Sequence, residues 1–302
     1  MSSLKIYFDN VNFKSLSGPN AFGLKLAREF TNLGHQIVFE NPDAQLSFIQ
    51  TNKKLAKNIL RLDGIYFNTS QDWKQLNAPI KISYDSADAI VFQSEFNKTL
   101  IEKYFGKHKN SHVIHNGTDF ETINKIPTFK HEILKKFNKL WLCASQWRPH
   151  KRLNENIEYF LSFSEKNDCL FIAGDVKNNI NKKYLQNERI IFVGTLDWVN
   201  LISLMKRADY FIHLAFLDHC PNVVVDARAC RCNIICASSG GTSEIAGKNS
   251  TIIKDINWDF SPIKLYEPPL LDMNNLTVLK TTVQDINIKT VAKKYVSIIE
   301  TL

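Results

Sequence analysis

The 302-residue sequence contains no apolar stretch approaching the roughly 20 residues that a helix needs to cross a bilayer. Its first ten residues, MSSLKIYFDN, lack the charged start and apolar core of a signal peptide, so we expect a cytoplasmic protein. The chain also lacks low-complexity segments and repeats of solenoid period. Its 44% apolar and 23% charged residues are typical of a globular protein, and its length favours two domains of ordinary size.

Cysteine is absent from the first 142 residues of the chain. The six cysteines are Cys143, Cys169, Cys220, Cys230, Cys232 and Cys236. Because most have apolar neighbours, we expect free thiols that pack as small hydrophobic side chains in a reducing cytoplasm. Cys230 and Cys232 are separated by one residue instead of the two usual for zinc, and no paired histidine follows them, so we predict no metal site.

Basic residues are numerous but are not gathered into clusters. The net charge is +8, yet the lysines are scattered, as in KKLAKNILR and EKYFGKHKN, and resemble those of ordinary helix surfaces. A nucleic-acid-binding face combines clustered basic residues with aromatic ones, so we predict no nucleic-acid partner. The excess charge is equally compatible with an anionic small ligand and with peripheral contact to an acidic membrane surface. It says nothing about the oligomeric state.

Strand-like and helix-like periodicities alternate along the chain. Residues 4–9 predict a strand, residues 21–34 a helix that ends at Gly34, and residues 35–40 a second strand, which together form a βαβ unit. Three further apolar runs occur at residues 44–50, 58–67 and 87–94. A helix should then begin at the cap Ser94 and end at Gly106.

A second βα series follows a stretch, residues 122–137, in which the periodicity fades. We therefore predict a first domain over residues 1–120, a connection over 121–135 and a second domain over 136–302. The last helix is compatible with packing back on the first domain. Two successive βα series predict two doubly wound α/β domains that face each other, with ligands bound beyond the carboxyl ends of the strands, in the cleft between the domains.

The stretch FLDHCPNVVVDARAC, residues 216–230, places two carboxylates eight positions apart. Pro221 suits the first turn of a helix, so Asp218 should precede that helix and Asp226 should lie in its second turn. Both acids could then meet one ligand lying across the helix start. The alternative is a solvated capping residue followed by an unrelated aspartate.

Two other motifs are suited to an anionic ligand. In SSGGTSEIAG, Gly240 and Gly241 precede a helix start, where backbone N–H groups can approach an anion or sugar hydroxyls, although a plain Gly-Gly turn is the alternative. In WRPHKR, Arg148 and Lys151 could neutralise a diphosphate, although a solvated basic turn would look the same. Near the N-terminus, LSGPNAFG departs from the dinucleotide fingerprint, because the glycine after Gly18 comes five residues later. This spacing argues against a nicotinamide enzyme.

The order of these motifs resembles the retaining glycosyltransferases of family 4 (group 1), which have the GT-B fold of two facing Rossmann-like domains. The resemblance spans nearly the whole chain and is strongest over residues 140–247. The matching stretches are LSGPNAFG, ADAIVFQSEF, VIHNGTDF, ASQWRPHKRL, IIFVGTL, FLDHCPNVVVDARAC and SSGGTSEIAG. The family carries two glutamates eight residues apart, and both positions hold aspartate here, Asp218 and Asp226.

The resemblance implies a role for each matching residue. Arg148 and Lys151 would bind the donor diphosphate, Asp218 would face the donor sugar, and Asp226 would face the ribose. The residues expected to complete the donor site are Gly18, Gly194, Thr195, Leu196, His219, Pro221, Asn222, Gly240, Gly241, Thr242 and Glu244. No cofactor and no metal are implied, since the nucleoside diphosphate sugar is a co-substrate.

The sequence also departs from the family. The usual arginine before the Pro-x-Lys element aligns with Gln146, so Arg148 is expected to take over its task. Where many members keep a first-domain histidine near the acceptor, this chain offers Arg61 and Asp63. Asp63 could orient an acceptor hydroxyl, or Arg61 and Asp63 could simply pair.

The implied activity is that of a retaining, hexosyltransferase-like enzyme of polysaccharide biosynthesis. It would move a sugar from a nucleoside diphosphate sugar to a hydroxyl of a glycan, a lipid-linked acceptor or a protein. The alternative is a catalytically inactive scaffold protein that binds sugar nucleotides, to which the Asp-for-Glu exchanges and the displaced arginine lend weight.

Overall fold

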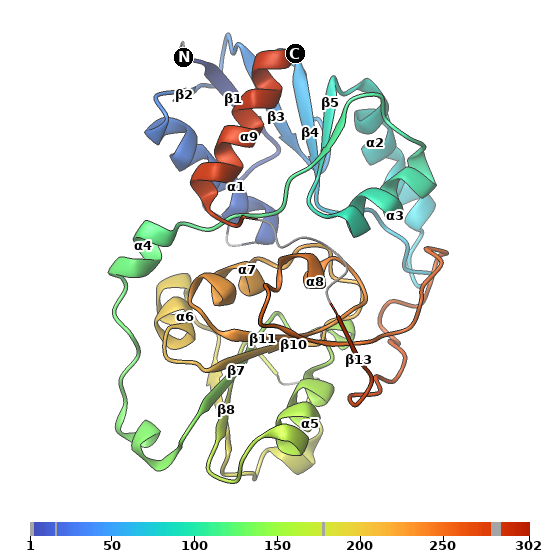
Figure 1. Cartoon of the computed structure of the whole chain (residues 1–302). Coiled ribbons are helices and arrows are strands. Elements are labelled where there is room, and N and C mark those ends of the chain that lie inside the picture. The colour runs from blue at the N-terminus through green and yellow to red at the C-terminus, as the bar shows by residue number, and fades with distance from the viewer. Residues whose placement is uncertain (1–2, 16, 177–178, 279–284) are drawn as a thin grey trace.

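The computed structural model describes residues 3–15, 17–176, 179–278 and 285–302. It contains two sheets, which lie in an upper and a lower lobe in Figure 1. The strand order is β2-β1-β3-β4-β5-β6 in the first sheet and β13-β12-β11-β10-β7-β8-β9 in the second. The strands pair in parallel, except that β12 and β13 are antiparallel.

The first lobe is a parallel sheet covered by helices on both faces. Its strands are β1 (Lys5–Asp9), β2 (Gln36–Ile37), β3 (Ala44–Phe48), β4 (Asn58–Leu62), β5 (Ala89–Phe92) and β6 (Ser111–Val113). Its helices are α1 (Gly18–Asn32), α2 (Trp73–Ser86), α3 (Glu95–Phe105) and, from the end of the chain, α9 (Ile288–Thr301). Side chains alternate along the strands, so Ile59 packs with α1 and α9 whereas Leu60 packs with α2 and α3.

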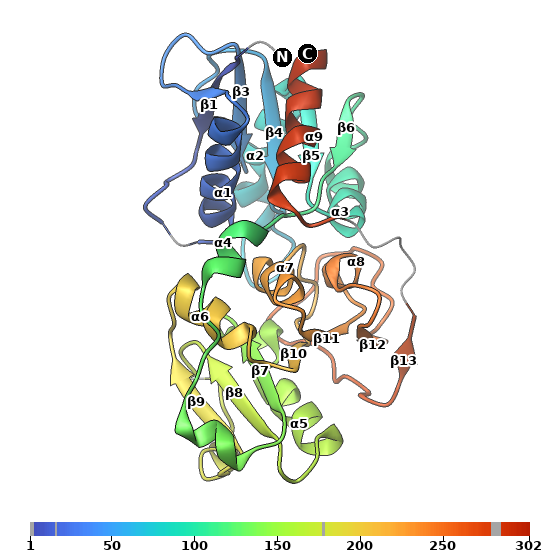
Figure 2. The same cartoon turned by 60° about the vertical axis from the view of Figure 1, so that its left-hand side comes forward.

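Helix α9 joins the end of the chain to the first lobe. Figures 1 and 2 show this red helix beside the blue helix α1. Its Val291 and Tyr295 belong to the same buried cluster as Phe22 of α1. The last helix therefore belongs to the first lobe, although it follows the second lobe in the sequence.

The second lobe is built in the same way. Its strands are β7 (Leu140–Ala144), β8 (Cys169–Ala173), β9 (Ile190–Gly194), β10 (Tyr210–His213), β11 (Asn233–Ala237), β12 (Thr251–Ile253) and β13 (Leu276–Thr277). Its helical segments are η2 (Pro149–Lys151), α5 (Leu153–Phe163), η3 (Lys182–Tyr184), α6 (Trp198–Met205), α7 (Asn222–Ala229) and α8 (Thr242–Ile245). One face of the sheet packs on α5, and the other on α6, α7 and α8.

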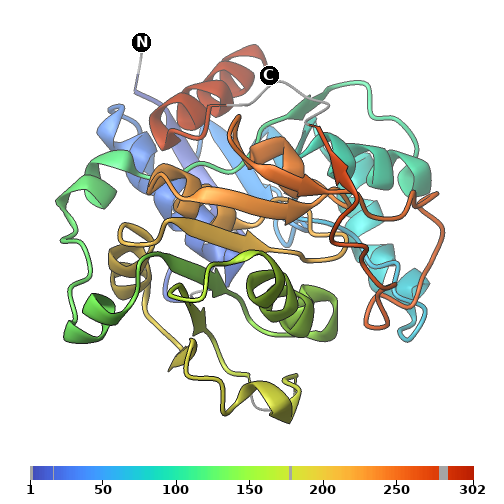
Figure 3. The same cartoon turned by 60° about the horizontal axis from the view of Figure 1, so that its bottom comes forward.

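The connection between the lobes contains α4 (Phe120–Lys125) and η1 (Glu132–Lys136). A second segment, residues 256–267, returns from the second lobe to the first. Its Ile263 donates its N–H to the Phe67 carbonyl and accepts from the Thr69 N–H. In Figures 1 and 3 this orange-red segment runs out beside the cyan part of the first lobe.

Buried polar contacts hold the two lobes together. The Glu244 carboxylate accepts hydrogen bonds from the Glu95 and Phe96 N–H groups at the start of α3, at 2.8 and 2.9 Å, and lies 2.8 Å from His115 Nε2. An acid at a helix N-terminus satisfies unpaired N–H groups and complements the helix dipole. His219 reaches into the first lobe, where its Nδ1 lies 3.0 Å from Asn97 Nδ2.

Gly241 lies at the tightest point of this interface. A Cβ atom at residue 241 would lie 2.0 Å from the His219 carbonyl oxygen and 2.6 Å from Ser94 Oγ. Only a residue without a side chain can occupy this position, because the backbone of the Asp218–His219 loop cannot move aside without breaking the lobe contact.

We predict that Gly241→Ala lowers the free energy of unfolding by about 1–3 kcal/mol, the usual cost of overpacking. Gly18→Ala is the matched control, because its Cβ would have its nearest neighbour at 3.7 Å, an ordinary contact. We expect the control to stay within about 0.5 kcal/mol of the natural protein in urea unfolding. Equal stabilities for the two variants would contradict this description of the interface.

Candidate functional site

A cleft of about 710 Å³ lies between the lobes. Its lining comes from helices α1, α4, α6, α7 and α9 and from the loops that follow strands of both sheets. In the second sheet, β7 and β10 lie side by side although their successors β8 and β11 lie on opposite sides of them. Such a switch point leaves a crevice beyond the carboxyl ends of the strands, where ligands of open α/β sheets bind. Residues after β7 and β10 are therefore the first candidates.

The structure brings most of the predicted site residues to this cleft. Those that line it are Gly18, Asp63, Arg148, Lys151, Leu196, Asp218, His219, Pro221, Asn222 and Asp226. Seven predicted residues lie outside its lining: Arg61, Gly194, Thr195, Gly240, Gly241, Thr242 and Glu244.

Asp218 is held in the cleft by three contacts to its carboxylate. Its Oδ2 lies 2.5 Å from Lys151 Nζ and 2.9 Å from His213 Nε2, and its Oδ1 accepts the His219 N–H. Burial opposes ionisation of this carboxyl, but the Lys151 ammonium and His213 outweigh it and hold its pKa well below the usual range. Asp218 is thus a carboxylate that keeps the Lys151 ammonium in the cleft.

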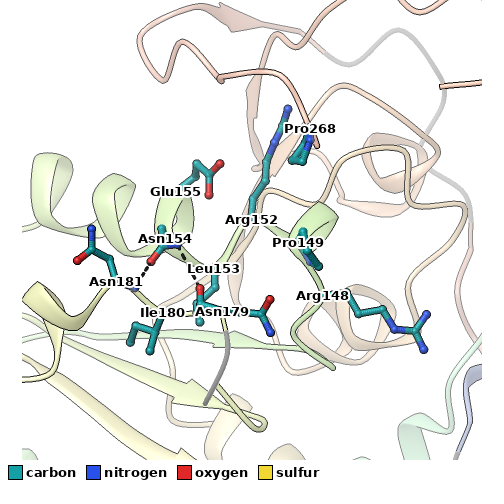
Figure 4. Close-up of a pocket in the computed structure, with 10 residues that line it drawn as sticks. All are labelled: Arg148, Pro149, Arg152, Leu153, Asn154, Glu155, Asn179, Ile180, Asn181 and Pro268. Atoms are coloured by element: carbon teal, nitrogen blue, oxygen red, sulfur yellow. Dashed lines mark hydrogen bonds between the residues drawn. The ribbon is translucent and has the colours of Figure 1, made fainter. Parts of the chain in front are cut away.

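Arg148 and Arg152 stand on either side of Lys151 but differ in their surroundings. The Arg148 side chain is exposed and forms no hydrogen bond or ion pair with the residues that the structure describes. Arg152 is buried and binds Asp255 and the Pro269 carbonyl. Figure 4 shows the two side chains pointing in different directions, Arg152 toward Pro268 and Arg148 away from it. Arg148 is therefore available to a ligand, whereas Arg152 anchors the loop.

The start of α5 borders a second, smaller hollow of about 480 Å³ (Figure 4). Asn154 links α5 to the loop after β8 through the Asn179 carbonyl and the Asn181 N–H. Arg148 lines both this hollow and the interlobe cleft. Asn179 also donates to the Trp147 carbonyl at 2.7 Å, so it helps to position the loop that carries Arg148.

Asp226 is surrounded by donors from both lobes. Its Oδ1 lies 3.0 Å from Lys25 Nζ and accepts the Thr118 hydroxyl at 2.5 Å, and its Oδ2 accepts the Trp198 indole N–H at 2.9 Å. The carboxylate occupies the second turn of α7, as the motif predicts, but a ribose would have to share it with these protein donors.

The groups of the glycine-rich motif are used in contacts within the protein. Gly241 donates its N–H to the Asp218 carbonyl at 2.7 Å, so this amide is already used within the protein. Glu244 is likewise committed to α3 and His115, and α8 is a helix of only four residues. The sequence motif looks like an anion site because it places glycines before a helix, yet the first lobe covers it.

The peptide His219–Asn222 forms the edge of the cleft next to the first lobe. Asn222 accepts from Asn116 Nδ2 and donates to the Gly18 carbonyl at 2.9 Å. Burial lowers the pKa of His219 to about 4, so its ring is neutral near pH 7. The contact with Gly18 brings the start of α1 to the edge of the cleft that α7 forms.

Arg61 and Asp63 form an ion pair, and Asp63 also faces the cleft. Arg61 is fully buried and binds Asn116 at 2.5 Å, so it cannot reach a ligand. Asp63 Oδ2 has no hydrogen-bond partner among the described residues. Burial raises the pKa of Asp63 against the opposing effect of Arg61. Of the two possibilities that the sequence left open, the pair exists, and it leaves one carboxylate oxygen unused.

Several cleft residues were not identified from the sequence. Lys25, Thr118, Trp198, His150 and His213 all lie in or beside the cleft. His213 ends β10 next to the switch point, and that position could have indicated it. Lys25 gives no such signal, because a lysine on an amphipathic helix is normally solvent-exposed.

Within the described ranges, no group of three or more histidine, cysteine, aspartate or glutamate side chains is arranged to hold a metal ion. In the same ranges, no helix combines the length and apolar character that a membrane crossing requires. All six cysteines are free, and burial raises the pKa of each thiol.

Residues 125–259 match the family model of glycosyl transferases group 1. Two uncharacterized glycosyltransferases of Methanocaldococcus jannaschii are 26% identical over 65% of this chain and 27% identical over 68% of it. The chain spans about half the length of these curated relatives, 52% and 55%. These matches support a glycosyltransferase of group 1.

Solved structures match the whole fold. Anabaena HepE in complex with UDP-glucose has a TM-score of 0.67 at 14% identity, covering 99% of this chain and all of that one. Sucrose-phosphate synthase from Thermosynechococcus elongatus has a TM-score of 0.69 at 10% identity, covering 99% and 98%. WaaG, a glycosyltransferase involved in lipopolysaccharide biosynthesis, has a TM-score of 0.61 at 13% identity, covering 99% and 96%. The predicted GT-B fold is confirmed.

Burial of His150 predicts that the stability of the protein depends on pH. Its ring is buried and Nδ1 has no partner among the described residues; burial, with the nearby Lys151 ammonium, lowers its pKa to about 3. The unfolded chain binds this proton near pH 6.5, so the stability that the neutral ring contributes is present above pH 6.5 and is lost as the pH falls toward 3.

Between pH 7 and pH 5, protonation of His150 in the unfolded chain should lower the free energy of unfolding by about 2 kcal/mol. We therefore predict that His150→Gln loses about 2 kcal/mol less than the natural protein over that interval, measured by urea unfolding at both pH values. An identical pH dependence in the two proteins would show that the native state does not exclude the proton.

Proposed function

We propose that this chain is a retaining, metal-independent glycosyltransferase of family 4. It transfers a hexose from a nucleoside diphosphate sugar to a hydroxyl of a glycan, lipid-linked or protein acceptor in polysaccharide biosynthesis. The observation that carries the proposal is the placement of Arg148 and Lys151, beside Asp218, in the cleft between the two lobes. The match of residues 125–259 to the group 1 glycosyltransferases supports the same reaction class.

The leaving diphosphate is the group that most needs stabilisation, because it gains negative charge as the bond to the sugar breaks. An exposed guanidinium can bind two phosphate oxygens at once, and an ammonium supplies a compact positive charge. Fixed charges of this kind stabilise the developing negative charge without reorganising. Arg148 and Lys151 therefore bind the two phosphates and stabilise the departing nucleotide.

Asp218 has two tasks in this mechanism. It holds the Lys151 ammonium in place, and it accepts a hydrogen bond from a hydroxyl of the donor sugar. The base lies beyond Asp226, near Leu196 and Trp198, both of which line the cleft. The complex of Anabaena HepE with UDP-glucose makes UDP-sugars the first donors to test.

The acceptor enters from the first lobe, where Asp63 lines the cleft. A carboxylate in this position accepts a hydrogen bond from the attacking hydroxyl and so orients it toward the sugar. No strong protein nucleophile is required, since positioning and charge stabilisation supply the catalysis.

We expect Lys151→Ala to lower the rate of sugar transfer or donor hydrolysis by about 100-fold or more, as loss of a single charge-stabilising group does. Lys81→Ala is the control, because Lys81 is a surface lysine of α2 that pairs with Asp85. A radiolabelled donor panel measures both variants, and circular dichroism verifies their folds. Unchanged turnover in Lys151→Ala would remove the proposed role of this residue.

Asp63→Asn tests the acceptor side separately. We expect transfer to the acceptor to fall about 10-fold or more while hydrolysis of the donor by water stays near the natural rate, because donor contacts remain intact. The ratio of transfer to hydrolysis, measured by product chromatography, is the readout. An equal fall in both rates would assign Asp63 to the donor or to the fold.

A further inference from the structure

Lys25 extends from the first lobe into the donor side of the cleft. It lies on α1, and its ammonium lies 3.1 Å from Thr118 Oγ1, 3.0 Å from Asp226 Oδ1 and 5.2 Å from the centre of the Trp198 ring. Asp226 and Trp198 belong to the second lobe. Lys25 therefore forms a charged contact between the lobes within the cleft itself.

Asp226 is poorly placed to bind a ribose by itself. Its side chain is 5% exposed, and its oxygens already accept from Lys25, Thr118 and Trp198. Lys25 is 16% exposed and lines the same part of the cleft. An ammonium has three N–H donors, of which Thr118 and Asp226 engage two. The donor that remains is available to an oxygen of a ligand.

We propose that Lys25 is a specificity-determining residue that recognises the ribose hydroxyls of the bound nucleotide. This inference rests on the proposed function, in which the ligand is a nucleoside diphosphate sugar. A hydroxyl can accept a hydrogen bond from the Lys25 ammonium and donate one to the Asp226 carboxylate, so it suits both members of the pair. A phosphate matches it poorly, because Asp226 would repel its charge.

This assignment also explains how the site tolerates aspartate in place of the longer glutamate. Lys25 spans the gap that the missing methylene leaves between the carboxylate and the ligand. Because Lys25 belongs to the first lobe, recognition of the ribose requires both lobes. A nucleotide without the hydroxyl would leave the ammonium without its third partner, which costs affinity.

Isothermal titration calorimetry tests the proposal. UDP, GDP, ADP and CDP are titrated into the full chain, and the tightest binder is then compared with its 2′-deoxy and 3′-deoxy analogues. We expect the natural protein to prefer the ribonucleotide over at least one of these analogues by about 10-fold, as for a hydrogen bond to a charged group.

In Lys25→Met, we expect the ribonucleotide to bind about 10-fold more weakly and the preference over that analogue to fall to near unity. Lys81→Met, which removes one positive charge from the surface of α2, should keep both the affinity and the preference. Lys25→Gln retains an N–H donor and is measured beside the methionine variant, with thermal unfolding as the check on folding. If Lys25→Met does not fold, partial retention of the preference in Lys25→Gln is the supporting result.

Two results would overturn the inference alone: a full ribose preference in a folded Lys25 variant, or an equal weakening of ribo- and deoxynucleotides, which would point to a phosphate contact. Failure of all four nucleoside diphosphates to bind the natural protein would overturn the proposed function, and the inference with it.

Discussion

Asp218 joins the three segments on which the cleft depends, through its carboxylate and its backbone carbonyl. Lys151 comes from the loop after β7, His213 from the end of β10, and Gly241, whose N–H binds the Asp218 carbonyl, from the loop after β11. A negative charge at the switch point keeps a lysine ammonium there instead of in bulk solvent. The Arg148 guanidinium is left without a protein partner among the described residues, so it offers the cleft a positive charge that no carboxylate neutralises.

The lobes meet through polar groups that find their partners across the interface. Glu244 binds the start of α3, Asn116 binds Asn222, and Lys25 binds Asp226. Glu244, Lys25 and Asp226 each have hydrogen-bond partners across the interface, which is the condition under which burial of charge is tolerated. Separation of the lobes would leave several of these groups to be satisfied by water. The same contacts therefore set both the stability of the closed arrangement and the geometry of the cleft.

Local signals in the sequence predicted much of this architecture. Ser94 caps α3 and Gly106 ends it as expected, and α5 starts at Leu153 as predicted. The predicted helix at residues 21–34 begins earlier, at Gly18, because Ser17 and Pro19 form a helix start. Helix α2 was not predicted, since Pro79 lies inside it and its sequence is polar. Strand 35–40 is reduced to two residues at the sheet edge.

Contacts between segments far apart in the sequence could not be predicted from such local signals. Glu244 follows two glycines at a helix start, which is a typical ligand motif, but only the folded chain shows that α3 and His115 use its carboxylate. The same holds for Arg61 and Asp63. Their closeness in the sequence suggests that they pair, but it does not show which oxygen of the Asp63 carboxylate lacks a partner. Lys25 and Asp226 are separated by 201 positions, so no local pattern relates them.

The most direct test of the central claim is a crystal structure of the chain with a nucleoside diphosphate bound. We expect the two phosphates to lie within hydrogen-bonding distance of Arg148 and Lys151, between β7 and β10, with the ribose beside Asp226. A nucleotide bound outside the interlobe cleft, for example in the hollow at the start of α5, would contradict the account.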